Sequence, residues 1–169
     1  LIGFANGGIV SNCHVQGTIN STSGEIGGII GLAYSVSATN GVYITRSSAD
    51  IQITAGAGSV GGLVGRAQGF FTINRSHTSG NASVPTNVSA NYIGGLVGLT
   101  EGFGGGFGTI SNSYSSVTVN TNSSGGTTVG GFIGTSASDT SINYTYVNGT
   151  LNPSYVSYGF SSGACTKVS

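Results

Sequence analysis

Few side chains in this sequence could take part in chemistry. It has four acids, Glu25, Asp50, Glu101 and Asp139, against four Lys and Arg. Cleavage of a polysaccharide needs two carboxyl groups about 5–10 Å apart. Glu101 and Asp139 follow equivalent glycines of neighbouring segments and could approach each other, but Arg66 is an equally good neighbour for Glu101, and a surface ion pair is the commoner arrangement. We therefore expect no catalytic residue and no enzyme, with a polysaccharide-cleaving enzyme as the third alternative.

The two histidines are better explained by packing than by metal binding. His14 and His77 fall at the same position of a recurring phrase as Tyr114 and Tyr146. Stacked rings on a shared wall explain all four residues. Metal sites need several converging ligands, and no spacing of Cys, His or acids supplies them. We expect no metal and no cofactor.

The two cysteines leave three possibilities open. An even number of cysteines in a secreted protein favours pairing, but Cys13 and Cys165 lie near opposite ends of the sequence. If the chain coils, they are separated by about 20 Å along the axis at about 4.8 Å per coil, whereas a disulfide needs Cα atoms within about 7 Å. The bond is then intermolecular, or intramolecular with the tail folded back, or absent, with Cys13 a small buried filler.

Seven asparagines stand in Asn-X-Ser/Thr sequons and are candidates for N-glycosylation: Asn20, Asn74, Asn81, Asn87, Asn122, Asn143 and Asn148. Asn74 and Asn143 follow an inward β-branched residue, so strand alternation points them outward. Asn81, Asn87 and Asn122 fall in predicted loops. The alternative is that all seven are ordinary turn and ladder residues. Asn12 and Asn112, outside any sequon, are expected to form a stacked ladder or a corner.

The elements that would position these residues repeat along the chain. The phrase Gly-Gly-apolar-apolar-Gly begins at Gly27, Gly61, Gly94 and Gly130, and Leu1-Ile2-Gly3 resembles the end of an earlier copy. A fixed period of this length is typical of repeat architectures, in which each unit buries its apolar face against its neighbours.

A second phrase follows each glycine phrase. Its first position is β-branched, its fourth is small and its fifth is often a ring: Val10–His14, Ile44–Ser48, Ile73–His77, Ile110–Tyr114 and Ile142–Tyr146. Alternating stretches such as Val117-Thr118-Val119 come next, which is strand chemistry with a period of two. Nothing indicates a helix. The loosest insertions, Gly102–Gly108 and Asn120–Thr128, are expected to be loops on one side; no helix follows these glycines, so they are not phosphate loops.

These patterns predict an all-β fold, a parallel β-solenoid (β-helix) with about one coil per repeat and right-handed winding as the default. The whole chain, 1–169, forms a single solenoid domain with repeats at approximately 1–26, 27–60, 61–93, 94–129 and 130–169, the last one atypical. The paired glycines let the backbone bend sharply or pack against the opposite wall, and the apolar pair fills the interior.

The two phrases together closely resemble the GLUG repeat of bacterial surface proteins. Gly94–Gly98 with Ile110–Tyr114 is the best copy, and the resemblance covers the chain to about Gly149. It implies a secreted or surface-exposed repetitive protein of adhesin or stalk character, and it carries no catalytic or binding residues to transfer. The wealth of sequons departs from the usual bacterial pattern.

Composition limits the partners. The net charge is zero, which argues against nucleic acid and anionic membranes, since both need clustered Lys and Arg. No apolar run approaches the roughly 18 residues of a membrane span, so we expect no membrane insertion. The chain lacks Met and begins inside a repeat, so we expect a processed product or a segment of something longer, secreted or on a cell surface.

These observations favour a structural function. Solenoid ends present unpaired strand edges, and we find no polar cap at Leu1 or in the aromatic-rich stretch Tyr155–Phe160. We expect head-to-tail assembly with further copies of the chain into an extracellular filament or stalk, with N-glycans covering its sides. The alternative is an adhesin spacer, a module that binds glycans or a host protein, although no cluster of exposed Tyr and Asn stands out.

Overall fold

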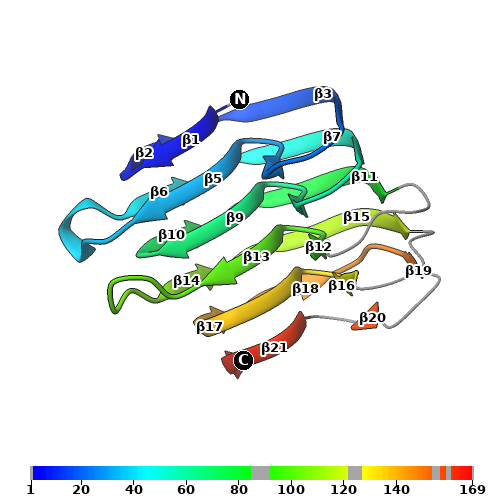
Figure 1. The fold of residues 1–169 in the computed structure, drawn as a ribbon. Coiled ribbons are helices and arrows are strands. Elements are labelled where there is room, and N and C mark those ends of the chain that lie inside the picture. The colour runs from blue at the N-terminus through cyan, green and yellow to red at the C-terminus, as the bar shows by residue number, and fades with distance from the viewer. Residues whose placement is uncertain (1, 85–91, 122–126, 154–156, 159–160, 169) are drawn as a thin grey trace.

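The computed structural model describes residues 2–84, 92–121, 127–153, 157–158 and 161–168. In these residues the chain is nearly all strand, and every pairing is parallel. Figure 1 shows a coil that descends from the N-terminus to the C-terminus, each turn lying under the one before. The predicted β-solenoid is confirmed. A single 3₁₀ turn, Ala38–Asn40, is the one departure from strand and loop in the described ranges.

The strands lie on four faces, which the chain visits in the same order in every coil. Face 1 holds β1 (Ile2–Asn6), β5 (Ile30–Ser35), β9 (Val64–Gly69), β13 (Val97–Glu101) and the first parts of β17 (Ile133–Asn143) and β21 (Ser161–Val168), whose second parts lie on face 2. Face 2 holds β2 (Gly8–Ser11), β6 (Val42–Thr45), β10 (Phe71–Asn74), β14 (Gly108–Ser111) and the second part of β17. Because β17 runs without interruption, it joins faces 1 and 2 into one sheet.

The other two faces close the coil. Face 3 holds β3 (His14–Ser21), β7 (Ser48–Ala55), β11 (His77–Val84), β15 (Tyr114–Thr121), β18 (Tyr146–Val147) and β19 (Leu151–Pro153). Face 4 is narrow and holds β4 (Ile26–Gly27), β8 (Ser59–Gly61), β12 (Tyr92–Gly94), β16 (Thr128–Gly130) and β20 (Ser157–Tyr158). The glycine phrase therefore marks the passage from face 4 to face 1.

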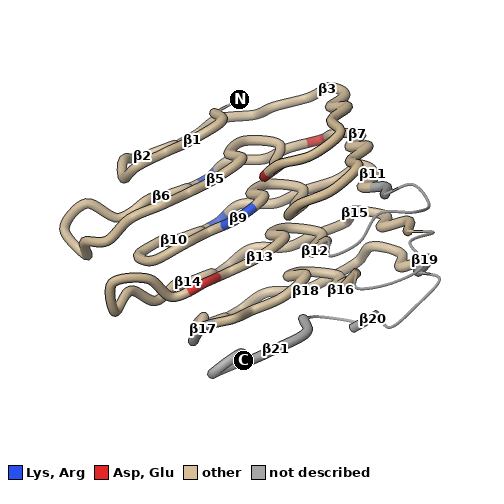
Figure 2. The backbone as a smooth tube through the Cα atoms, viewed as in Figure 1, with Lys and Arg blue, Asp and Glu red and all other residues tan. Residues whose placement is uncertain are grey.

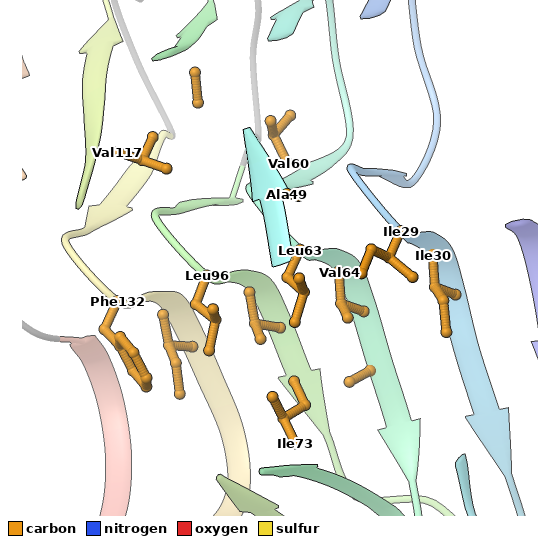
Figure 3. Packing of buried hydrophobic residues seen from close by; sticks show 14 of the residues in the cluster. Ile29, Ile30, Ala49, Val60, Leu63, Val64, Ile73, Leu96, Val117 and Phe132 are labelled. Atoms are coloured by element: carbon orange, nitrogen blue, oxygen red, sulfur yellow. The ribbon is translucent and has the colours of Figure 1, made fainter. Parts of the chain in front are cut away.

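Equivalent residues of successive repeats are Cα partners. On face 1 the register places Ile30 beside Val64, then Val97, then Ile133. The preceding apolar residues Ile29, Leu63, Leu96 and Phe132 are all buried and follow one another along the interior, as Figure 3 shows. Burial of such branched and aromatic side chains is the main stabilising term, about 1.5–3 kcal/mol for each.

Each of the two leading glycines has its own steric reason. A Cβ on the first, Gly61, would lie within 3.0 Å of the backbone of Val64 and of Gly98 in the next coil. Because glycine has no Cβ, Gly61 permits the sharp turn into face 1. A Cβ on the second, Gly95, would collide with Ser115 on face 3. Both predicted roles of the glycine pair are therefore present, one at each position.

The corner between faces 2 and 3 has positive φ in every coil. The residues there, with φ of 48–53°, are Asn12, Arg46, Arg75, Asn112 and Tyr144. The predicted corner at Asn12 and Asn112 is confirmed, whereas the presence of Arg and Tyr at equivalent positions was not expected, because these residue types seldom adopt the left-handed region.

The connections between faces 1 and 2 differ in length from coil to coil. One coil uses Val36–Gly41 with the 3₁₀ turn, the next turns through Gly69 and Phe70, and the third uses the glycine-rich insertion. Figure 1 shows the two long connections projecting from the same side. The insertion is more closely packed than predicted, since Gly106 is buried and its N–H donates to the carbonyl of Phe103 at 3.0 Å. In the second predicted loop, 122–126 lie outside the described residues.

Candidate functional site

The first coil of this sequence has ladder partners on one side only within the described residues: β1 pairs β5, β2 pairs β6 and β3 pairs β7. Gly8 donates its N–H to the carbonyl of Gly41, just before β6, and Asn12 donates its N–H to the carbonyl of Thr45, the last residue of β6. By the alternation of a parallel ladder, the N–H groups of Ile9 and Ser11 point away from β6. This open edge is therefore a row of backbone donors and acceptors ready to pair with another strand.

Apolar side chains surround the open edge. Ile9 is 75% exposed and Phe4 is 58% exposed. The inward residues of the same coil, Val10, Val15 and Ile19, are only partly buried, although they continue columns that are buried in the coils below. An indentation of about 310 Å³ lies at this end, between the start of β1, the end of β3 and β4. The geometry is that of a coil interior left partly uncovered.

A second hollow lies on the flank, at the corner between faces 1 and 2. It has a volume of about 280 Å³ and is lined by Ala38, Gly41, Tyr43, Phe70, Phe71, Thr72, Phe107 and Thr109. The rings of Phe70 and Phe107 stand 6.1 Å apart and are inclined by 56°. We call this hollow the corner cleft.

A neighbouring aromatic group extends along face 1. Tyr34 contacts Phe4 at a centroid distance of 6.2 Å and Phe103 at 5.5 Å. The exposed rings that meet at this corner are those of Phe, whereas the sequence-based expectation concerned exposed Tyr and Asn only. An excess of Phe in otherwise glycine-rich connections was the available signal.

Two of the acids, Glu25 and Glu101, contact the same cation. Arg66 lies between Glu25 and Glu101: its Nη1 is 3.5 Å from Glu25 Oε1, its Nε donates to Glu101 Oε2 at 3.2 Å, and its Nη2 also contacts that oxygen. Burial alone would lower the pKa of Arg66, but the two carboxylates outweigh it and raise the pKa. The predicted ion pair between Arg66 and Glu101 is present. The side chain of Asp139 lies outside the described residues.

Three of the four rings in the histidine column form a stack, as predicted, whereas His14 does not join it. His77 lies 4.6 Å from Tyr114 with an interplanar angle of 7°, and Tyr114 lies 4.8 Å from Tyr146. Ser48 separates the two histidines, and its hydroxyl is 2.8 Å from His14 Nδ1. Burial lowers the pKa of His77, with a further contribution from His14.

Cys13 occupies the column of small residues that continues with Ser47, Ser76 and Ser113. It is a free cysteine and is exposed, so the alternative that it is a buried filler was wrong. It belongs to the coil whose upper side is uncovered, which explains the exposure. The side chain of Cys165 lies outside the described residues, and its backbone is in β21.

The sequon asparagines differ in accessibility. Asn20 and Asn148 are exposed, whereas Asn74, Asn81 and Asn143 are half-buried and donate hydrogen bonds to Ser111, Gln52 and Ser141. Asn87 and Asn122 lie outside the described residues. Asn20 and Asn148 therefore have the freest amides of the described five.

Among the described residues, no group of three or more His, Cys, Asp or Glu side chains is placed to hold a metal ion. Within the same residues, the chain has no helix of the length and apolarity needed to cross a bilayer.

Comparison with known proteins gives one match. The family model described as the GLUG motif matches residues 89–120. This segment includes β12, β13, β14 and most of β15, and it contains the copy singled out in the sequence. No curated protein and no solved structure matches the chain. The chain therefore carries a GLUG motif, and the motif corresponds to nearly one full coil.

Proposed function

We propose that this chain, which carries a GLUG motif within a stack of similar coils, is an extracellular structural protein. Its copies join end to end into a filament or stalk, and N-glycans cover its sides. The observation that supports this most strongly is the ladder register: each coil pairs with the next through equivalent residues, such as Ile30 with Val64 and Val64 with Val97, so a coil of another copy would fit in the same way.

Within the described residues the open edge of the first coil is unpaired, and a further coil, of a longer chain or of another copy, would cover it. Natural sheets protect their edges with charges, prolines, bulges or a covering segment. The strands β1 and β2 contain no charged residue and no proline. Ile2 and Phe4 are exposed beside the edge. Another copy that adds its own strand would satisfy the backbone groups and cover the apolar residues in one step.

The flanks of the coil, unlike the open edge, are kept in solution by polar side chains. Figure 2 shows that charged residues are sparse along the coil, so solubility depends on hydroxyl and amide side chains. Sugar on Asn20 and Asn148, which are exposed, would keep neighbouring rods apart. The scarcity of Lys and Arg also leaves few sites for trypsin-like proteases, which suits an extracellular location.

Sedimentation velocity on the purified 169-residue chain tests the assembly. The unaltered chain is expected to form species whose size grows with concentration. Ile9→Pro removes an N–H that makes no bond to β6 and places a ring where the added strand would lie, so it should give monomers. Ile9→Ala removes the same apolar side chain and retains the N–H, so it should still assemble. A chain that stays monomeric at every concentration would contradict the proposal.

A second candidate function is a spacer that binds glycans or a host protein on a cell surface. The observation that favours it is the corner cleft, because exposed aromatic side chains gathered at a hollow are typical of binding sites.

A further inference from the structure

We propose that the corner cleft binds an uncharged sugar, a neutral pyranose unit of a glycan. This inference rests on the second candidate function and gives it a site and a ligand class. It depends on no contact at the open edge, so the two proposals can fail separately.

The walls of the corner cleft are aromatic. Phe107 is 59% exposed, and its ring lies 6.1 Å from the ring of Phe70 at an interplanar angle of 56°. Tyr43 forms a third wall, and its hydroxyl donates to the carbonyl of Ala38 at 3.2 Å, which holds the ring in place. A pyranose presents a face of C–H groups that packs on the electron-rich face of such a ring.

The floor of the corner cleft supplies hydroxyl groups. Tyr43, Thr72 and Thr109 are Cα partners on face 2, one in each of three successive coils. Their side chains therefore lie in one outward column with a spacing of about 4.8 Å. A row of hydroxyls beside aromatic walls matches a ligand whose ring faces are apolar and whose edges carry hydroxyls.

The ligand should carry no charge. Of the described residues that line the corner cleft, none is Asp, Glu, Lys or Arg. A carboxylate, sulfate or phosphate in it would lose hydration without gaining an opposite charge. The volume, about 280 Å³, is just below the usual range for small-molecule pockets of about 300–1,000 Å³.

A peptide strand fits the corner cleft less well than a sugar. An added strand needs a free sheet edge, but β10 at the centre of the floor is paired with β6 on one side and β14 on the other. Only side chains, and not unpaired backbone groups, are available on that face. The corner cleft therefore fits a ligand that is held by stacking and hydroxyl contacts.

Affinity electrophoresis in native gels tests the inference. The gels contain either a neutral polysaccharide (a β-glucan, a mannan or a starch-type α-glucan) or an anionic one (polygalacturonate or heparin). At least one neutral polysaccharide should retard the chain, and the anionic ones should not. Phe107→Ala should weaken binding by about tenfold or more, because a central aromatic anchor commonly contributes over about 1.4 kcal/mol.

Phe103→Ala is the matched control. Phe103 comes from the same connection and is 45% exposed, but it does not line the corner cleft. The affinity of Phe103→Ala for the neutral polysaccharide should stay within about twofold of that of the unaltered chain, since truncation outside a hot spot has little effect. Absence of retardation by every neutral polysaccharide, retardation by the anionic ones alone, or equal losses in both variants would overturn the inference. An unchanged sedimentation profile of Phe107→Ala would show that assembly is separate.

Discussion

The hydroxyl of Ser76 accepts the backbone N–H of Ser47, one coil above, at 3.2 Å, and donates to the carbonyl of Asn74 at 3.0 Å. Ser113 repeats the arrangement one coil below, where its Oγ accepts the N–H of Ser76. The small residue of the second phrase therefore links coils at the left-handed corner, where the regular backbone ladder is interrupted.

Ser76→Ala should lower the free energy of unfolding by about 1–3 kcal/mol, because the buried N–H of Ser47 would lose its acceptor. Urea denaturation followed by circular dichroism measures the change. Ser48→Ala is the control: its hydroxyl contacts His14 at the exposed surface, so its effect should stay within about 0.5 kcal/mol. Equal effects of the two variants would contradict the role of the serine column.

The glycine columns predict a second effect on stability. Gly95→Ala places a methyl group against Ser115 and the carbonyl of Gly131, and should destabilise the chain by about 1–3 kcal/mol or more through overpacking. Gly3→Ala is the matched control. Gly3 belongs to the third-glycine column in the first coil, and a Cβ there would meet no atom within 4 Å. Thermal unfolding of the two variants side by side should separate them; similar midpoints would mean that the opposite walls are not this close.

His77 predicts how stability depends on pH. Its pKa is lowered from the ordinary value of 6.5, first by burial and then by His14. Below pH 6.5 the unfolded chain therefore binds more protons at this site than the folded chain does, so stability falls as the pH drops and levels off below the folded pKa. Above pH 6.5 this residue contributes no slope.

NMR titration of the His77 ring measures the pKa directly. His77→Asn should remove the contribution of His77 to the pH dependence of the free energy of unfolding, measured by urea denaturation between neutral and acidic pH. His14→Asn should shift the pKa of His77 upward, because one of the two causes is removed. A His77 pKa at or above 6.5 in the unaltered chain would rule out this account of the ring stack.

Glycosylation should follow accessibility. When the chain is secreted from a eukaryotic cell, glycopeptide mass spectrometry should find sugar at Asn20 and Asn148, which are exposed. Asn20→Gln and Asn148→Gln should each reduce the intact mass by one glycan. Asn74 donates to Ser111 at 2.6 Å within the outer face, so its occupancy should be lower. Sugar on Asn74 with none on Asn20 and Asn148 would reverse the expected order.

Much of the fold was predictable because its constraints are periodic. The column through Leu63, Leu96 and Phe132 follows from the glycine phrase, and the stack of His77 on Tyr114 follows from the second phrase. The glycine phrase recurs along the chain and the ring recurs in most copies of the second phrase, so a register could be inferred without knowing any contact.

The features that escaped prediction have no such period. Arg46 and Arg75 adopt positive φ, which their residue type disfavours, because the corner geometry of the whole column overrides local preference. The corner cleft joins Phe70 and Phe107 from connections of unequal length, so no spacing in the sequence relates them. The exposure of Cys13 depends on what covers the first coil, which a column alone does not reveal.

The central claim is that coils of one copy continue into coils of the next. Electron cryomicroscopy of the purified chain tests it most directly. The account predicts unbranched filaments with a strand spacing of about 4.8 Å along the axis that continues without a break from one copy into the next. Isolated particles one chain long, or filaments whose strands lie across the contact at another angle, would contradict it.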